Sequence, residues 1–180
     1  MLFSVLLAAP AVTIDPETRT FRVADGRQVT LHGVNMVRKE APYFVNTTGP
    51  FDYNMSVVDE DIAFLRRHGF NFVRLGVMWP GVYPAQGEVN ETYLDVVEDL
   101  VNKLGEEGIY TLLDMHQDVL SAFMCGEGIP DWAVPVEVPG VAAFPIPVTD
   151  TAYARDEQGY IDRETCLEKT FASYYNSNQT

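Results

Sequence analysis

The stretch GFNFVRLGVMW, Gly69 to Trp79, decides the fold of this 180-residue chain. Aromatic and β-branched residues fill it and Pro80-Gly81 closes it, which predicts a strand over Phe70–Trp79 that ends in a turn. Similar apolar runs lie on either side, at Val29–Val37 (VTLHGVNMV) and at Ile109–Met115 (IYTLLDM). The chain is therefore expected to contribute at least three strands to one sheet.

Two amphipathic segments separate these strands. Ser56–Gly69 has apolar residues at helical spacing, starts with a Ser-x-x-Asp pattern like a capping box, and ends on a glycine. Asn90–Leu104 shows the same periodicity, which predicts a second helix. Strands that alternate with helices indicate βαβ units and a parallel sheet, and the right-handed crossover rule places both helices on one face.

The pattern changes after the third strand. Residues 119–158 are rich in Pro and Gly and predict a long loop, while Thr13–Arg27 predicts a hairpin and Arg163–Tyr175 a further helix. A (β/α)₈ barrel takes about 250 residues. The predicted class is therefore α/β, an incomplete TIM (β/α)8 barrel with about the first three βα units plus a long loop, over residues 13–180.

Composition narrows the functions. Twelve Lys and Arg against 26 Asp and Glu give a formal charge of −14, which disfavours binding to nucleic acids and to anionic membranes. The sequence contains no apolar run of the length that a transmembrane helix needs, so no membrane-spanning segment is predicted.

Several features indicate the secretory route. Residues 1–12 are apolar, with small residues at Ala9 and Ala11, and predict a signal segment; a buried first strand is the alternative. Four Asn-x-Ser/Thr sequons predict glycosylation of Asn46, Asn54, Asn90 and Asn178. Cys125 and Cys166, the only two cysteines, predict one disulfide. The expected location is outside the cell or in a lysosomal or vacuolar lumen.

The densest polar cluster ends the third predicted strand. Asp114 and His116 fall on one face of that strand, and Asp118 follows them. At the carboxyl end of a barrel strand, such groups could orient a sugar hydroxyl or tune a catalytic acid. A metal site is a competing interpretation, but a single His gives it little support, and no metal is predicted. Backbone pairing at the strand end is the structural alternative.

Two cations and two tryptophans are weaker candidates. Arg74 interrupts an apolar strand, so it needs a carboxylate partner, either a catalytic one or a structural one. Lys39 follows the first strand, where it could donate to sugar hydroxyls or simply be solvated. Trp79 and Trp132 could stack on sugar rings or pack internally.

Five blocks of the sequence carry a family resemblance. They are IDPETRTF from Ile14, LHGVNMVRK from Leu31, GFNFVRLGVMWPGVYPAQGEVNETYLD from Gly69, LLDMHQD from Leu112 and GEGIPDWA from Gly126. With them the chain resembles the endoglycoceramidases of glycoside hydrolase family 5. The resemblance implies a TIM barrel, no cofactor, and retaining hydrolysis of the oligosaccharide–ceramide linkage of glycosphingolipids.

The resemblance also implies roles for residues. Lys39, Asp114, His116 and Asp118 would contact sugar or shape the site, and Arg74 would neighbour the nucleophile. The family's acid/base glutamate lies in an Asn-Glu-Pro motif, which does not occur in this sequence. Both catalytic glutamates are thus expected downstream, and the 180 residues alone are expected to be inactive. The alternatives are a non-catalytic sugar- or lipid-binding remnant and a related family 5 β-glucosidase or glucosylceramidase.

Overall fold

The structure is a computed structural model, and it describes residues 9–48, 51–52, 55–118, 121–134, 156–158 and 160–168. These residues fall into two compact units. The first takes its described residues from Met1–Arg38, Phe44–Gly76 and Thr92–Asp114. The second takes them from Lys39–Tyr43, Val77–Glu91 and Met115–Thr180.

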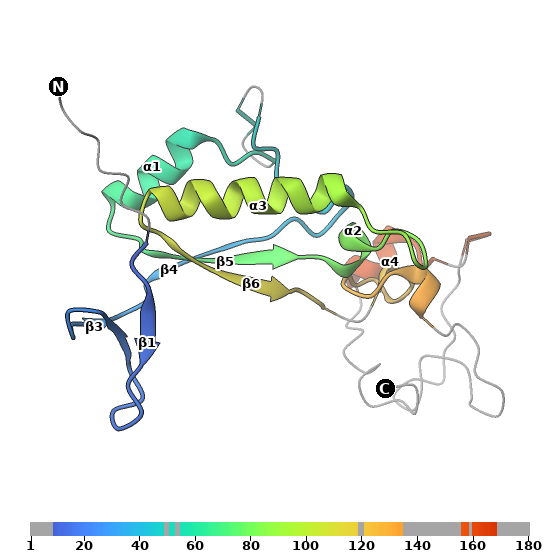
Figure 1. Ribbon diagram of the computed structural model, residues 1–180. Helices are drawn as coiled ribbons and strands as arrows, with labels where there is room; N and C mark the ends of the chain where they lie inside the picture. Colours follow the sequence, from blue (N-terminus) through green and yellow to red (C-terminus); the bar gives the residue numbers. More distant parts are fainter. Residues whose placement is uncertain are drawn as a thin grey trace. The chain divides into compact units, whose positions relative to one another are not determined.

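A parallel sheet organises the first unit. Its strands are β4 (Gly33–Met36), β5 (Phe72–Val77) and β6 (Tyr110–Met115), in the order β4-β5-β6. β4 and β5 pair in parallel, with Gly33 opposite Phe72 and Met36 opposite Leu75, and the three strands run in the same direction in Figure 1. The prediction of a parallel sheet is confirmed.

Two helices cover one face of this sheet. α1 (Asp59–Arg67) and α3 (Glu91–Glu106) lie on the same side of the strands (Figure 1), as the crossover rule predicts. Between helices and strands lies a core of buried apolar residues: Met36, Ile62, Val73, Leu75, Leu100, Leu104 and Ile109. Burial of these side chains holds the sheet and helices together.

The start of α1 differs from the prediction. The structure places its N-cap at Val58, where the Asp61 carboxylate accepts a hydrogen bond of 2.9 Å from the Val58 backbone N–H. Ser56 is instead part of the preceding turn, because its hydroxyl exchanges two 2.8 Å hydrogen bonds with the backbone of Asp52. The prediction of a helix start at Ser56 is therefore wrong.

The predicted strand Val29–Val37 is two strands in different sheets. Its first residue ends β3 (Gln28–Val29), which pairs antiparallel with β2 (Phe21–Val23), and β2 in turn pairs with β1 (Val12–Ile14). β4 begins only at Gly33, and a Cβ on this residue would lie 1.7 Å from the Phe72 carbonyl oxygen. Glycine therefore allows the close approach of the two backbones at the start of the parallel pair.

Part of the proposed signal segment makes backbone contacts in this unit. The Ala9 N–H donates to the Gly105 carbonyl at 2.8 Å, and Val12 is the first residue of β1. Residues 1–8 lie outside the described residues, and so do the sequons at Asn54 and Asn178.

The second unit is built from short elements. These are α2 (Trp79–Val82), the 3₁₀ turns η1 (Ala122–Met124) and η2 (Asp131–Ala133), and α4 (Arg163–Glu168). A disulfide joins Cys125 to Cys166, with the two Cα atoms 5.4 Å apart. The described residues after β6 are thus irregular apart from these short elements, as the Pro- and Gly-rich sequence predicts, and residues 119–120 and 135–155 of the predicted loop lie outside the described residues.

The described residues confirm the α/β class. Their parallel sheet has three strands and does not close into a barrel. Within this part of the chain, the structure contains no helix with the length and apolar character required to cross a bilayer.

Candidate functional site

Arg74 and Asp114 form an ion pair in the first unit. Arg74 sits on β5 between Val73 and Leu75, which both point into the core, so strand alternation places the guanidinium on the opposite face. Its Nη2 lies 2.7 Å from Asp114 Oδ2, and the two side chains are 36% and 20% exposed. Asp114, on β6, is therefore the carboxylate partner that the sequence analysis required for Arg74.

A second polar group, which we call the Lys39 cluster, lies in the second unit and comprises Lys39, His116, Asp118 and Glu127. The Lys39 ammonium lies 2.5 Å from Asp118 Oδ2 and 2.7 Å from Glu127 Oε1. Lys39 thus meets two carboxylates of the segment after β6, which is distant from it in sequence.

Main-chain hydrogen bonds hold the two carboxylates together. The Asp118 N–H donates to the Glu127 carbonyl at 2.9 Å, and the Glu127 N–H donates back to the Asp118 carbonyl at 2.8 Å. This antiparallel bridge holds the two backbones side by side. The distance between the two carboxylates is therefore limited by the main chain as well as by the side chains.

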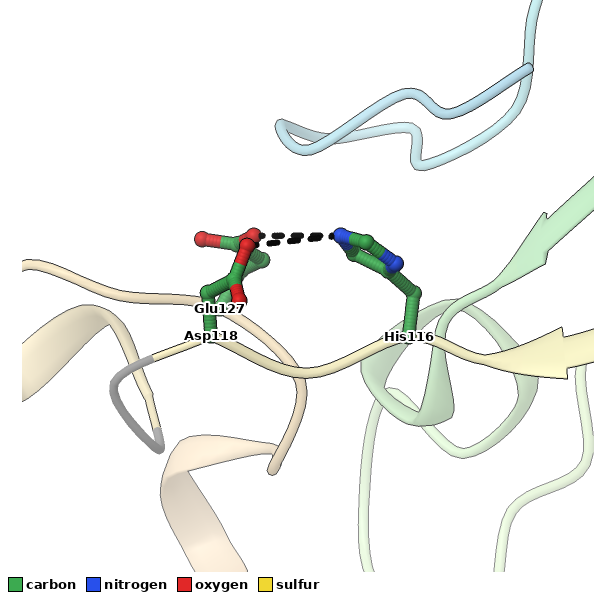
Figure 2. Close-up of side chains that lie close together, drawn as sticks. All are labelled: His116, Asp118 and Glu127. Atoms are coloured by element: carbon green, nitrogen blue, oxygen red, sulfur yellow. Dashed lines mark ion pairs between the residues drawn. The ribbon is translucent and has the colours of Figure 1, made fainter. Parts of the chain in front are cut away.

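His116 completes the cluster. Its Nε2 lies 3.5 Å from Asp118 Oδ2 and 3.7 Å from Glu127 Oε1, and its side chain is 10% exposed. Figure 2 shows the imidazole directed toward both carboxylates. Of the residues predicted from sequence, the structure thus brings Lys39, His116 and Asp118 together.

The charges of the cluster stabilise one another. The hydrogen bonds that the Lys39 ammonium donates to Asp118, as the main cause, and to Glu127 raise the pKa of Lys39. The hydrogen bond from Lys39 is the main cause that lowers the pKa of Asp118. Lys39 and Asp118 are therefore both ionised at neutral pH, and together with a Glu127 carboxylate they offer adjacent donors and acceptors, as polyhydroxylated ligands require.

The cluster also contains the donor types that metals prefer. Ligand atoms of His116, Asp118 and Glu127 lie within 4.8 Å of one another, and one His with two carboxylates is a plausible set for a divalent cation. The Lys39 ammonium, however, already contacts both carboxylates and supplies positive charge to them. A metal would have to displace this ammonium, so the geometry favours an organic ligand over a metal ion.

Glu127 was not among the site residues chosen from sequence. It lies in the loop after β6, between Gly126 and Gly128. Gly128 has φ of 131°, and a Cβ there would lie 2.5 Å from the Cβ of Gln117. A Gly-Glu-Gly run within a block that carries the family resemblance was the available signal, because glycines permit such backbone conformations and close approaches.

The two tryptophans pack against each other. The Trp79 and Trp132 rings meet edge to face, with centroids 6.0 Å apart and planes at 87°. The Trp132 indole N–H also donates to the Tyr83 carbonyl at 2.9 Å. The two rings thus pack on each other, the structural alternative for these residues, while Trp132 remains 40% exposed.

Two of the sequon asparagines lie in the described residues. Asn46 is exposed, and its side-chain oxygen accepts a hydrogen bond from the Thr48 N–H at 3.1 Å. Asn90 is partly buried and directly precedes α3. Exposure thus favours Asn46 over Asn90 as a glycan acceptor.

Known proteins share these sequence blocks and this fold. Residues 24–179 match the family Cellulase (glycosyl hydrolase family 5). Because this match covers most of the sequence, the chain belongs to glycosyl hydrolase family 5.

Among individual proteins, the chain is similar to endoglycoceramidases. The chain is 40% identical over 93% of its length to an endoglycoceramidase of Cyanea nozakii, and 39% identical over 91% to one of Hydra vulgaris. It covers 33% and 31% of these two proteins, about a third of their length. A solved complex of endo-glycoceramidase II from Rhodococcus sp. with ganglioside GM3 matches 77% of the chain, with a TM-score of 0.53 and 30% identity, over 30% of its own length.

Proposed function

We propose that this chain forms part of a retaining endoglycosidase that cleaves the oligosaccharide–ceramide linkage of glycosphingolipids. In this proposal the described α/β unit is the first part of a TIM barrel. The family membership and the endoglycoceramidase relatives support this reaction and this fold. A bound ganglioside in the Rhodococcus structure supports a glycosphingolipid as the substrate class.

The Lys39 cluster is the observation that carries the proposal. It combines an ammonium donor, two carboxylate acceptors and an imidazole immediately after a parallel strand. In this fold class, groups that follow the carboxyl ends of strands form the substrate site. Lys39 would donate hydrogen bonds to sugar hydroxyls, and Asp118 and Glu127 would accept hydrogen bonds from them.

Arg74 and Asp114 have a supporting role. Their ion pair lies on the face of the sheet opposite the helices, the face that becomes the interior when such a sheet closes into a barrel. The guanidinium would offer hydrogen-bond donors to carboxylates on this face, as it does to Asp114. Retaining chemistry further requires two catalytic carboxyl groups about 5–5.5 Å apart.

The test is product analysis with the protein expressed from its complete reading frame. Incubation with lactosylceramide should release intact lactose and ceramide in equal amounts. A glucosylceramidase-type enzyme would instead prefer glucosylceramide. Release of glucose from glucosylceramide, with lactosylceramide left intact, would refute the endoglycosidase proposal. Binding of lactosylceramide without any hydrolysis would identify a non-catalytic binding protein instead.

We also propose that the protein enters the secretory route. The apolar N-terminal segment, the exposed Asn46 sequon and the disulfide support this. Expression in a eukaryotic host should give an N-glycosylated protein in the lumen or medium. Asn46→Gln should remove one glycan, so the untreated variant should migrate one step faster than wild type, and the two should migrate alike after peptide N-glycosidase treatment. Unmodified wild-type protein would contradict the proposal.

A further inference from the structure

A cavity of about 270 Å³ lies in the second unit, and Lys39 and Glu127 form part of its wall. Apolar surface comes from Pro80 and Ile129, and a further polar group comes from Asp131. Pockets for drug-sized ligands span ~300–1,000 Å³, so this cavity has room for a single small ring. We call it the Asp131 cavity.

Residues from the far end of the described chain hold Asp131 in place. The Tyr160 hydroxyl donates a short hydrogen bond to Asp131 Oδ2. The Tyr160 ring stacks on Phe123, with centroids 4.7 Å apart and planes at 22°, and the Cys125–Cys166 disulfide ties the two segments together. Two further contacts, the ring stacking and the disulfide, therefore hold the segment from which Tyr160 orients the carboxylate.

The Tyr160 phenol remains a hydrogen-bond donor under ordinary conditions. The hydrogen bond to Asp131 is the main cause that raises the pKa of Tyr160 to about 12. The phenol therefore keeps its proton, and with it the hydrogen bond to Asp131, across the range in which proteins of this kind are assayed.

The charges on the cavity wall select for a neutral ligand. Glu40, Glu127 and Asp131 contribute three carboxyl groups, whereas Lys39 contributes one ammonium group. Carboxylates accept hydrogen bonds from hydroxyl groups, and they repel a ligand that carries its own negative charge. Apolar side chains opposite such acceptors suit the mixed polar and CH surface of a pyranose.

We propose that the Asp131 cavity binds one neutral sugar ring, with Asp131 accepting hydrogen bonds from ring hydroxyls and Tyr160 acting as its positioning residue. The proposal deepens the proposed function, because it assigns part of the glycan to a defined pocket of the same site. It also predicts discrimination against acidic sugars at this pocket.

The experiment measures binding directly, so that it does not depend on turnover. Methyl β-glucoside and methyl β-glucuronide, which differ by one carboxylate, are titrated by NMR into the protein expressed from its complete reading frame. The glucoside should bind at least about tenfold more tightly than the glucuronide, since a charged hydrogen-bonding group changes binding by this order. Equal binding of both would overturn the proposal.

Two substitutions test whether the sugar binds at Asp131 and whether Tyr160 supports this binding. Asp131→Asn should weaken glucoside binding roughly tenfold and narrow the preference over the glucuronide, because it removes one negative charge. Tyr160→Phe keeps the stacking on Phe123 and loses only the hydroxyl, so it should weaken binding by about 3- to 10-fold. Glu157→Gln, an exposed acidic position in the same segment, is the matched control and should bind like wild type.

The outcomes separate this proposal from the proposed function. Unfolding midpoints for each variant exclude loss of fold as the cause. Wild-type hydrolysis of lactosylceramide with unchanged glucoside binding in Asp131→Asn would refute the cavity and leave the endoglycosidase standing. Selective glucoside binding without hydrolysis would refute the endoglycosidase and leave the cavity standing.

Discussion

The Arg74–Asp114 pair and the Lys39 cluster show two ways in which this chain builds a polar site. The pair joins two strands of one sheet, and regular backbone geometry positions both partners. The cluster draws on Lys39 and on the loop after β6, and a two-residue bridge positions its carboxylates. Regular secondary structure thus positions the first site, whereas a backbone bridge within an irregular segment, near one disulfide, positions the second.

The largest effect is expected for hydrolysis. It shows whether the Arg74–Asp114 pair or the Lys39 cluster can hydrolyse a glycosylceramide without further catalytic groups. Residues 13–180 expressed alone should hydrolyse no fluorescent glycosylceramide at any pH from about 4 to 8, because a retaining mechanism needs two opposed carboxyl groups. The Asn-Glu-Pro motif is absent from these residues. Leu113 and Met115, exposed by 57% and 73%, should also make this chain poorly soluble.

The comparison is protein from the complete reading frame, assayed beside the short chain. Ceramide release by the short chain above a blank without enzyme would mean that a carboxylate of the Lys39 cluster, Asp118 or Glu127, performs the chemistry.

Removal of the disulfide should destabilise the unit that contains the Lys39 cluster and should leave the Arg74–Asp114 pair unchanged. Cys125 and Cys166 are separated by 41 positions, and closing a loop of this length stabilises a protein by about 3–4 kcal/mol in the chain-entropy model. The double variant Cys125→Ser/Cys166→Ser should lose this much in urea unfolding. Thiol labelling of unreduced, secreted wild-type protein provides the control, and modification of both cysteines would show that no disulfide forms.

Substitutions in the cluster should reduce turnover without unfolding the protein. His116→Ala and Asp118→Ala, made in the complete reading frame, should each lower turnover of a glycosylceramide roughly 10- to 150-fold, the effect of losing one charged hydrogen bond. Circular dichroism should remain that of wild type. Wild-type kinetics in both variants would show that the cluster is structural.

The strand pair should respond in the opposite way, through stability. Arg74→Met leaves the Asp114 carboxylate, 20% exposed, without its cation, and should cost about 1–3 kcal/mol in the free energy of unfolding. Lys103→Met is the matched control, because Lys103 pairs with an exposed Asp59 at 3.0 Å and should cost at most about 1 kcal/mol. An equal loss of unfolding free energy in Arg74→Met and Lys103→Met would show that the Arg74–Asp114 pair stabilises the protein no more than an exposed ion pair does.

The smallest effect concerns pH. Because the pKa of Asp118 is lowered from 3.8, its contribution to stability is present above pH 3.8 and disappears as the pH falls through the lower folded-state pKa. Because the pKa of Lys39 is raised from 10.5, its contribution is present below pH 10.5 and disappears as the pH rises through the higher folded-state pKa.

The ion pair should therefore be intact from about pH 5 to 9. Carbon NMR of the Asp118 carboxyl group measures this directly. In Lys39→Met the Asp118 pKa should rise toward its ordinary value, and an unchanged titration curve would show that Lys39 does not set it.

Sequence patterns predicted the regular part of the molecule well. The strand around Arg74, the two helices and their common face follow from local periodicity and from a handedness rule that holds across proteins. The need of Arg74 for a carboxylate partner also followed, since an arginine in an apolar strand requires compensation. The identity of that partner, Asp114 on the neighbouring strand, was not predicted, because local periodicity does not specify strand order.

The irregular part was harder to predict for physical reasons. Glu127 joins Asp118 through main-chain hydrogen bonds, which any residue can form, so no side-chain pattern marks the contact. The break between β3 and β4 depends on a tertiary contact, the backbone approach at Gly33. The N-cap at Val58 depends on a choice between local hydrogen bonds, because Ser56 bonds to Asp52 in the preceding turn and Asp61 bonds to Val58. Motif resemblance located Lys39, His116 and Asp118, and the bridge explains why Glu127 lies beside Asp118.

The backbone bridge between Asp118 and Glu127 also allows assembly of the site to be followed by amide hydrogen exchange. The amide protons of Asp118 and Glu127 are both donors in it, so their exchange with solvent deuterium is slowed whenever the two segments are paired. Two amide resonances would therefore follow assembly of the cluster in real time, in any buffer and in the absence of substrate. A folding defect and a chemical defect could then be told apart in a single spectrum.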